Sequence, residues 1–160
     1  MRFLSRLILF VLLLLLLACS DQQGAGEFVR RQVHGEFRVG DSTLHYVATY
    51  HDTTLVAVEE EQSYGDDGQA RARYEIVAGR LVYYRLDEQR RLMSTGDDDA
   101  FAEVSLELEF DAAGRIRRQT KLVDGEPTEL VGYEVPGVQI HFEELKRRVD
   151  LAQGAALGGM

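Results

Sequence analysis

The residue types that most often bind metal ions are present in this sequence, but they are widely spaced. The four histidines, His34, His45, His51 and His141, form neither a His-x-His nor a His-Glu-x-x-His pattern, so we interpret them as ordinary surface or hairpin residues. The acidic run 97–99 offers oxygen ligands for Ca²⁺, yet it lacks the alternating ligands and the distant Glu of a calcium-binding loop. We therefore predict a solvated acidic loop there, and no bound metal or other cofactor.

Catalytic side chains are not grouped in a recognisable pattern either. Glu59, Glu60 and Glu61 are consecutive, and consecutive strand residues point to opposite faces, so these carboxylates do not converge as an acid–base pair. There is no Gly-x-Ser-x-Gly segment, and the segment 65–68 has two aspartates where a phosphate would need amides and a lysine. The sequence predicts a protein that is not an enzyme, with a triad assembled from distant residues as the alternative.

The tyrosines are the residues that best suggest a binding surface, because tyrosine is favoured both in strands and at interfaces. A two-residue turn at 78–79 would place Tyr74 opposite Tyr83 on one face of a hairpin. Tyr84 would then lie on the other face, with Arg73 as its neighbour. We take Tyr84 and Arg73 as the candidate binding surface.

Charged residues predict the register of a second hairpin. Across the loop 65–68, Glu60 would fall opposite Arg73 and Gln62 opposite Arg71, which gives the sheet a polar outer face with paired charges.

The turn at 111–114 has two possible lengths. A four-residue loop would set the inward Leu108 beside Arg117. A five-residue loop would set Phe110 beside Ile116 and Glu109 beside Arg117, and we favour it, with a bulge or a left-handed residue at Gly114.

The composition fits one globular domain. The chain has 160 residues, of which 45% are hydrophobic and 28% charged, with only 2 Pro. Its formal charge of -9 argues against a nucleic-acid partner, which rewards an excess of Lys and Arg. The single Cys excludes an intramolecular disulfide.

The first residues differ from the rest of the chain. Arg2 and Arg6 precede the apolar run 7–18, and the polar segment 20–23 ends that run. This order is typical of an export signal, and the run is shorter than the roughly 20 apolar residues of a membrane-spanning helix.

The junction Leu16-Leu17-Ala18-Cys19 resembles the lipobox of bacterial lipoproteins. The resemblance implies cleavage before Cys19 and acylation of its thiol, for example with palmitate, so that the chain is anchored to a membrane. Ser20 after the Cys implies the outer membrane with the domain facing the periplasm, and the inner membrane is the alternative. Without the resemblance, the same residues would be interpreted as an ordinary secretory signal or as an uncleaved anchor.

The predicted organisation is therefore a signal peptide at 1–18, a lipidated tether at 19–27, a single β domain at 28–153 and a flexible tail at 154–160. Alternation of apolar and polar residues is clearest in Val104–Phe110. The other predicted strands, separated by short turns rich in Asp and Gly, are 36–39, 43–50, 54–63, 69–77, 80–86, 90–95, 115–123, 128–135 and 138–142.

Helical spacing of apolar residues occurs only near the end of the chain. Phe142, Leu145, Val149 and Ala152 predict an amphipathic helix over 142–153. The short turns leave no room for crossover helices, so we expect mainly β structure. The expected fold is an antiparallel up-and-down meander that forms a barrel or a strongly curved sheet, with one C-terminal helix.

These features predict a membrane-anchored periplasmic lipoprotein whose non-catalytic β domain binds a protein or another envelope component. A sharper version is an inhibitor of a basic hydrolase such as lysozyme, because the acidic charge would steer a cationic partner. The alternative is a lipocalin-like carrier of a small apolar ligand. A large apolar interior would favour the carrier, a filled core the binding domain, and convergent His, Asp and Ser an enzyme.

Overall fold

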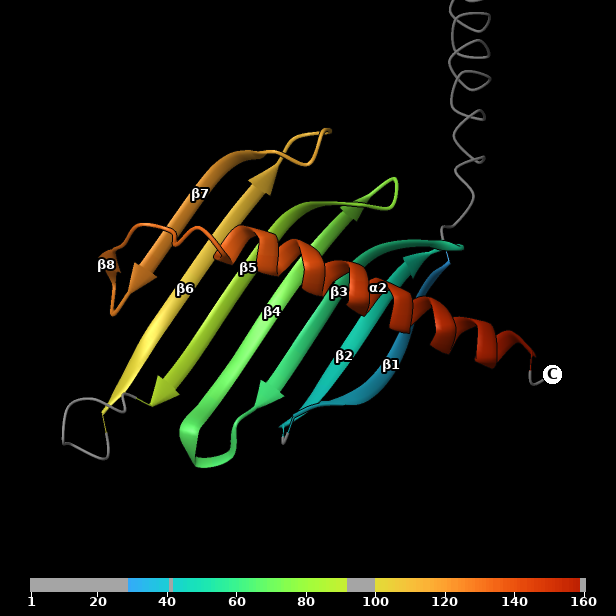
Figure 1. Ribbon diagram of the computed structural model, residues 1–160. Helices are drawn as coiled ribbons and strands as arrows, with labels where there is room; N and C mark the ends of the chain where they lie inside the picture. Colours follow the sequence, from blue (N-terminus) through green and yellow to red (C-terminus); the bar gives the residue numbers. More distant parts are fainter. Residues whose placement is uncertain (1–28, 41, 92–99, 159–160) are drawn as a thin grey trace, which may run out of the picture.

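The computed structural model describes residues 29–40, 42–91 and 100–158. Figure 1 shows eight strands side by side and one long helix that crosses them. The elements are β1 (Arg30–Val39), β2 (Ser42–His51), β3 (Thr54–Ser63), the short 3-10 helix η1 (Gly65–Asp67), β4 (Gly68–Val77), β5 (Arg80–Arg91), β6 (Phe101–Phe110), β7 (Ile116–Val123), β8 (Glu126–Pro127) and α2 (Glu134–Gly158). Cys19 and the whole predicted signal and tether lie outside the described residues.

The eight strands form one antiparallel sheet in which neighbours in the sequence are neighbours in space, from β1 to β8. The mainly β meander with one C-terminal helix is thus confirmed. The sheet is open, because β1 and β8 are its two edges in the described part of the chain. The closed barrel, one of the two predicted forms, is therefore not built by these strands.

Two-residue turns with left-handed backbone explain why the chain keeps reversing. Ala78 and Gly79 have φ of 50° and 74°, and Asp124 and Gly125 have φ of 53° and 82°. Turns with positive φ at both central residues match the right-handed twist of the strands that they join. The backbone conformation of these turn residues therefore determines where the β4–β5 and β7–β8 hairpins reverse.

A bulge changes the predicted register of the β4–β5 hairpin. Ile76 faces Leu81 as the two-residue turn requires, but the pairing shifts after this pair, so that Tyr74 faces Tyr84 and not Tyr83. One extra residue in a strand moves every later side chain to the other face. Tyr84 is therefore on the apolar face, and the predicted surface of Tyr84 beside Arg73 is wrong.

The β3–β4 pairing also differs by one residue from the prediction. Glu59 faces Arg73 and Glu61 faces Arg71, whereas Glu60 faces Ala72 on the opposite side of the sheet. The segment 65–67 folds as the 3-10 turn η1, and this longer connection sets the offset. Acidic and basic residues do face each other on this side of the sheet, as predicted, but the glutamates involved are Glu59 and Glu61.

The β6–β7 turn follows the longer of the two predicted loops. Phe110 faces Ile116, and Gly114 has a φ of 75° in the left-handed region. A register shift after Phe110 places Glu109 opposite Arg118, not Arg117. The left-handed backbone at Gly114 was one of the two predicted forms, but the bulge at Arg117 was not predicted.

Several strand boundaries need correction. The predicted strands 80–86 and 90–95 belong to the single strand β5, which runs from Arg80 to Arg91, and residues 92–95 lie outside the described part. The predicted strand 36–39 is only the second half of β1.

The predicted strands 128–135 and 138–142 are wrong. Residues 128–133 are irregular, and α2 begins at Glu134, so the helix extends well beyond the predicted bounds 142–153 at both ends. The predicted flexible tail is helical up to Gly158. Pro136 sits in the first turn, where its missing N–H breaks no intrahelical bond.

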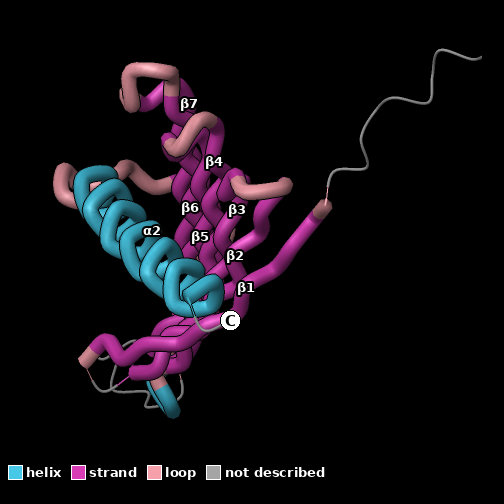
Figure 2. The backbone as a smooth tube through the Cα atoms, turned by 90° about the vertical axis from the view of Figure 1, so that its right-hand side faces the viewer, coloured by secondary structure: helices cyan, strands magenta, loops and turns pink. Residues whose placement is uncertain are grey.

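The helix α2 lies on one face of the sheet, which we call the inner face (Figure 2). Val138, Phe142, Leu145 and Val149 form the buried stripe of α2, and Leu145 and Val149 are 0% exposed. The inner face supplies their partners, which include Leu44, Tyr50, Val58, Tyr74, Leu81 and Leu108. Burial of these apolar side chains is the main stabilising term of the domain.

Polar contacts hold α2 along its length. Lys121 of β7 donates to Glu134 at 2.6 Å, and Gln139 donates to the carbonyl of Gly114 at 3.0 Å. Further along, Lys146 donates to the carbonyl of Gly79 at 3.2 Å. The helix therefore runs diagonally from the β7 side of the sheet towards β1, and it leaves the opposite face of the sheet uncovered.

Candidate functional site

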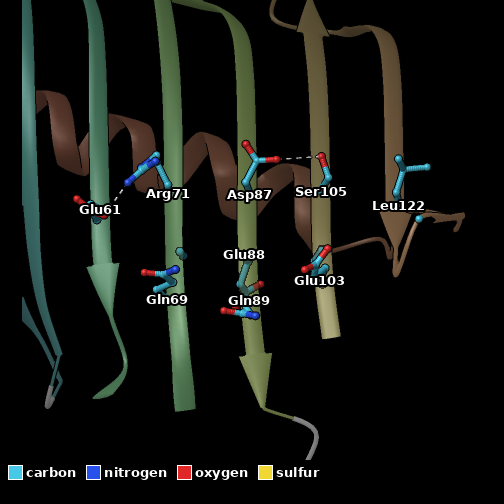
Figure 3. Close-up of a pocket in the computed structure, with 12 residues that line it drawn as sticks. Glu61, Gln69, Arg71, Asp87, Glu88, Gln89, Glu103, Ser105 and Leu122 are labelled. Carbon is cyan, nitrogen blue, oxygen red and sulfur yellow. Dashed lines mark hydrogen bonds and ion pairs between the residues drawn. The ribbon is translucent and has the colours of Figure 1, made fainter. Parts of the chain in front are cut away.

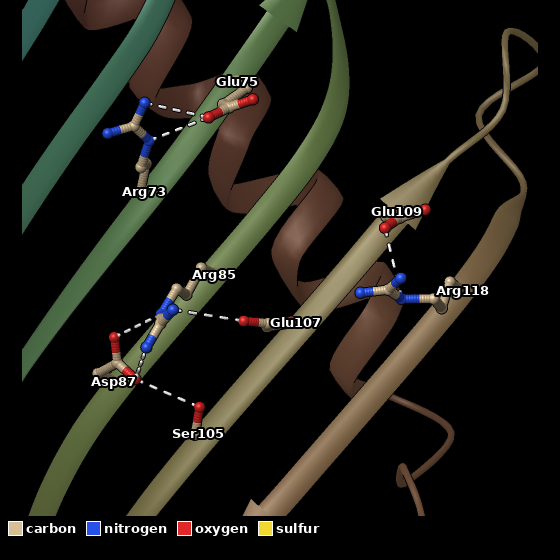
Figure 4. A network of polar contacts seen from close by, with 8 residues as sticks. All are labelled: Arg73, Glu75, Arg85, Asp87, Ser105, Glu107, Glu109 and Arg118. Carbon is tan, nitrogen blue, oxygen red and sulfur yellow. Dashed lines mark hydrogen bonds and ion pairs between the residues drawn. The ribbon is translucent and has the colours of Figure 1, made fainter.

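The face of the sheet opposite α2 carries a dense array of charged side chains, which we call the charged face. Alternation along each strand places these residues there, because their neighbours in sequence point into the core. The charged face includes Glu59, Glu61, Arg71, Arg73, Glu75, Arg85, Asp87, Glu103, Ser105, Glu107, Glu109 and Arg118. Figure 4 draws eight of them, from Arg73 to Arg118, on the near side of the strands, and α2 passes behind.

The β3–β4 part of the charged face is held by two arginines. Arg73 contacts Glu59 and Glu75, each at 3.0 Å, and Arg71 contacts Glu61 at 2.9 Å. These side chains are about half exposed or more, so each pair contributes only about 0–1 kcal/mol to folding. The pairs fix the positions of the carboxylates without removing them from solvent.

Arg85 joins β5 to β6 in the same way. Its guanidinium lies 2.8 Å from Asp87 and 3.4 Å from Glu107, and the hydroxyl of Ser105 donates to Asp87 at 3.2 Å (Figure 4). Hydrogen bonds from Arg85, with a smaller contribution from Ser105, hold the pKa of Asp87 below its usual value. Asp87 is therefore an ionised acceptor across the neutral pH range.

A shallow groove of about 470 Å³ lies between these strands on the charged face (Figure 3). Glu61 and Arg71 form one side, Asp87 and Ser105 lie in the middle, and Leu122 of β7 closes the other side. Gln69, Gln89 and Glu103 line its lower part. The groove is a polar trough with fixed hydrogen-bond acceptors and one apolar wall.

Among the residues named above, carboxylates outnumber arginines, which favours cationic partners. The four named arginines are all paired with carboxylates of the same face. The hydroxyl of Ser105 donates to Asp87, which also accepts from Arg85, so Asp87 and Ser105 belong to one fixed polar network. Chemically, the face can accept hydrogen bonds from cationic side chains and steer them by charge.

The two predicted binding residues lie on opposite faces of the sheet. Arg73 is on the charged face, in the ion pairs described above. Tyr84 is 5% exposed on the inner face, where its ring lies 5.0 Å from that of Tyr74. The sequence analysis missed Asp87, Ser105 and Glu103, although Arg85-x-Asp87 and Ser105-x-Glu107 alternate as outward residues of adjacent strands.

In the ranges 29–40, 42–91 and 100–158, no group of three or more His, Cys, Asp or Glu is arranged to hold a metal ion. The predicted acidic loop at 97–99 lies outside these ranges. Among the described helices, none is long and apolar enough to cross a membrane.

Comparison with known proteins gives no relative from which a role could be transferred. No protein-family model, curated protein or solved structure matches this chain.

Proposed function

We propose that this chain is a lipoprotein anchored through acylated Cys19 to the outer membrane, and that its β domain faces the periplasm and binds an envelope component. The observation that carries the proposal is that the two faces of the sheet differ: one packs against α2, and the other presents charged side chains to solvent. The helix α2 occupies the inner face, and no other helix or strand of the described residues covers the charged face. An exposed, ordered surface with fixed charges is typical of a binding domain.

A cationic protein is the partner class that this face fits best. The surplus carboxylates and the formal charge of -9 would raise the rate of encounter with a positively charged surface. The version in which the partner is a basic hydrolase such as lysozyme, and the domain inhibits it, has the same electrostatic support. Neither version requires a catalytic group in the domain.

The carrier of a small apolar ligand has less support. Such a carrier needs a large apolar space, and Val138, Phe142, Leu145 and Val149 of α2 take up the apolar part of the inner face.

We also propose that the sheet is strongly curved, as the sequence predicts, because curvature would bring both edges closer to α2.

The anchor has a direct test. Intact mass measurement of the protein from solubilised envelopes should give the mass of a chain that starts at Cys19 with added acyl groups. A Cys19→Ala variant should lose these groups and leave the membrane fraction. An unmodified thiol in the membrane-bound protein would contradict the proposed anchor.

The binding surface needs a matched pair of variants. The triple variant Glu61→Gln, Asp87→Asn, Glu103→Gln removes three carboxylates from the groove of the charged face. The control Glu126→Gln, Glu129→Gln, Glu143→Gln changes the net charge equally at exposed positions of β8, the loop after it and α2.

We expect the first variant to lose envelope proteins that the wild type captures, and the control to retain them. Lysozyme serves as a defined cationic probe in the same assay. Equal capture by both variants would contradict the assignment of the charged face.

A further inference from the structure

A second, smaller hollow of about 250 Å³ lies on the inner face beside the first half of α2. Unlike the groove on the charged face, it is set among aromatic rings. Its polar lining is formed by Glu60, Gln62, Tyr64, Tyr74, Tyr84, Glu88 and His141.

Two alanines of β4 create this hollow. Ala72 lies between Glu60 of β3 and Leu86 of β5, and Ala70 lies between Gln62 and Glu88. Because β4 carries only methyl groups at these two positions, a trough remains between the longer side chains of β3 and β5. The two carboxylates, Glu60 and Glu88, stand on opposite sides of this trough, two strands apart.

Glu60 is an acid in a position that packing alone would give to an apolar residue. Its side chain is 10% exposed, and it accepts a hydrogen bond of 2.6 Å from the hydroxyl of Tyr74. The Nε2 atom of His141 lies 2.9 Å from its other oxygen. A buried ion pair seldom adds stability over apolar residues of similar volume, so a carboxylate at this position points to a use other than packing.

Glu88 completes the negative side of the hollow. It is half-buried and has no ion-pair partner among the described residues. Burial, followed by the charges of Glu60 and Glu88, raises the pKa of the Tyr84 hydroxyl. Burial and the same two carboxylates also raise the pKa of Tyr64, against a smaller opposing effect of Arg90.

We propose that this hollow binds a small organic cation with one or two ammonium groups, held between Glu60 and Glu88 above Ala70 and Ala72. Each ammonium can donate hydrogen bonds to a carboxylate and to a tyrosine hydroxyl. Tyrosine rings attract cations at their faces, and the attraction is stronger where water is partly excluded. This site opens on the opposite face of the sheet from the proposed protein-binding groove, although Ala70 and Glu88 line both hollows.

A series of linear diamines tests the proposal. The full chain in a nonionic detergent is titrated calorimetrically with 1,3-diaminopropane, 1,4-diaminobutane and 1,6-diaminohexane, and with butylamine as the monovalent member. We expect binding that depends on chain length, because the two carboxylates are at a fixed separation. Absence of binding by every amine in the series would overturn the proposal.

Exposed carboxylates outside both hollows supply matched controls. Glu88→Gln and Glu60→Gln each remove one charge from the hollow, and the glutamine at position 60 keeps an acceptor for Tyr74 and His141. Glu126→Gln and Glu129→Gln remove the same charge at exposed positions of β8 and the loop after it.

We expect each hollow variant to weaken diamine binding about tenfold, which corresponds to losing one charge-assisted hydrogen bond. The two control variants should bind like the wild type. Equal weakening by hollow and control variants would assign the binding to net charge and overturn the site.

Discussion

The hydrogen bond from Tyr74 to Glu60 gives a quantitative prediction for the variant Tyr74→Phe. This substitution removes one hydroxyl and keeps the ring that stacks on Phe142 at 5.9 Å. Tyr74 is 1% exposed, so water cannot readily replace the lost donor. Hydrogen bonds to charged acceptors contribute about 1.5–3 kcal/mol, and we expect the free energy of unfolding to fall by about this amount.

The assay is urea unfolding followed by far-ultraviolet circular dichroism, because the chain has no Trp and tyrosine fluorescence would itself change in the variant. The control is Tyr133→Phe, which removes the same atom from a residue that is 74% exposed. It should change the unfolding free energy by less than about 0.5 kcal/mol. A Tyr74→Phe variant no less stable than this control would refute the buried pair and the hollow built on it.

Three further outcomes follow from the structure. The hydrogen bond with Glu60 raises the pKa of His141 in the folded protein, so the protonated form stabilises the fold at low pH. The stability advantage of wild type over His141→Gln, measured by urea unfolding, should be full below about pH 6.5 and shrink as pH rises through the folded pKa. An advantage that grew with pH would contradict this sign. Gly35→Ala should destabilise by about 1–3 kcal/mol, because a methyl group there would overlap the ring of Tyr46. Gly154→Ala, on open helix surface, should instead stabilise by about 0.5–1 kcal/mol in thermal unfolding.

Period-two alternation predicted most of the sheet because its strands have one buried and one solvated face. In β6, Leu106, Leu108 and Phe110 are buried, while Glu107 and Glu109 lie on the charged face. The pattern reports which residues share a face within a strand. It carries no information about a bulge between strands, which is why Tyr84 was placed on the wrong face.

The start of α2 was predicted as strand because two periods coincide there. Val138, Ile140 and Phe142 alternate like strand residues, and Val138, Phe142, Leu145 and Val149 also recur at helical spacing. Packing distinguishes the two patterns, since Ile140 is 72% exposed whereas Val138 and Phe142 are buried. Which of the two sets of apolar residues becomes buried depends on where the sheet lies, and the local sequence does not contain that information.

The two sites were less predictable than the fold. The charged face was anticipated as paired charges, because outward residues of adjacent strands have opposite signs. The hollow was not, because it depends on Glu60 lying on the inner face, which the β3–β4 register sets. His141 was interpreted as an ordinary residue, and its contact with Glu60 joins positions far apart in the sequence.

Site-specific photo-crosslinking tests the central claim, that the charged face binds an envelope component, most directly. A photoreactive residue replaces Gln89 in the groove in one variant and Ile140 on the solvent side of α2 in the other. Both are irradiated in the cells that produce the protein, and adducts are identified by mass. We predict a discrete adduct from position 89 and none from position 140. Adducts only from position 140, or the same adducts from both, would contradict the account.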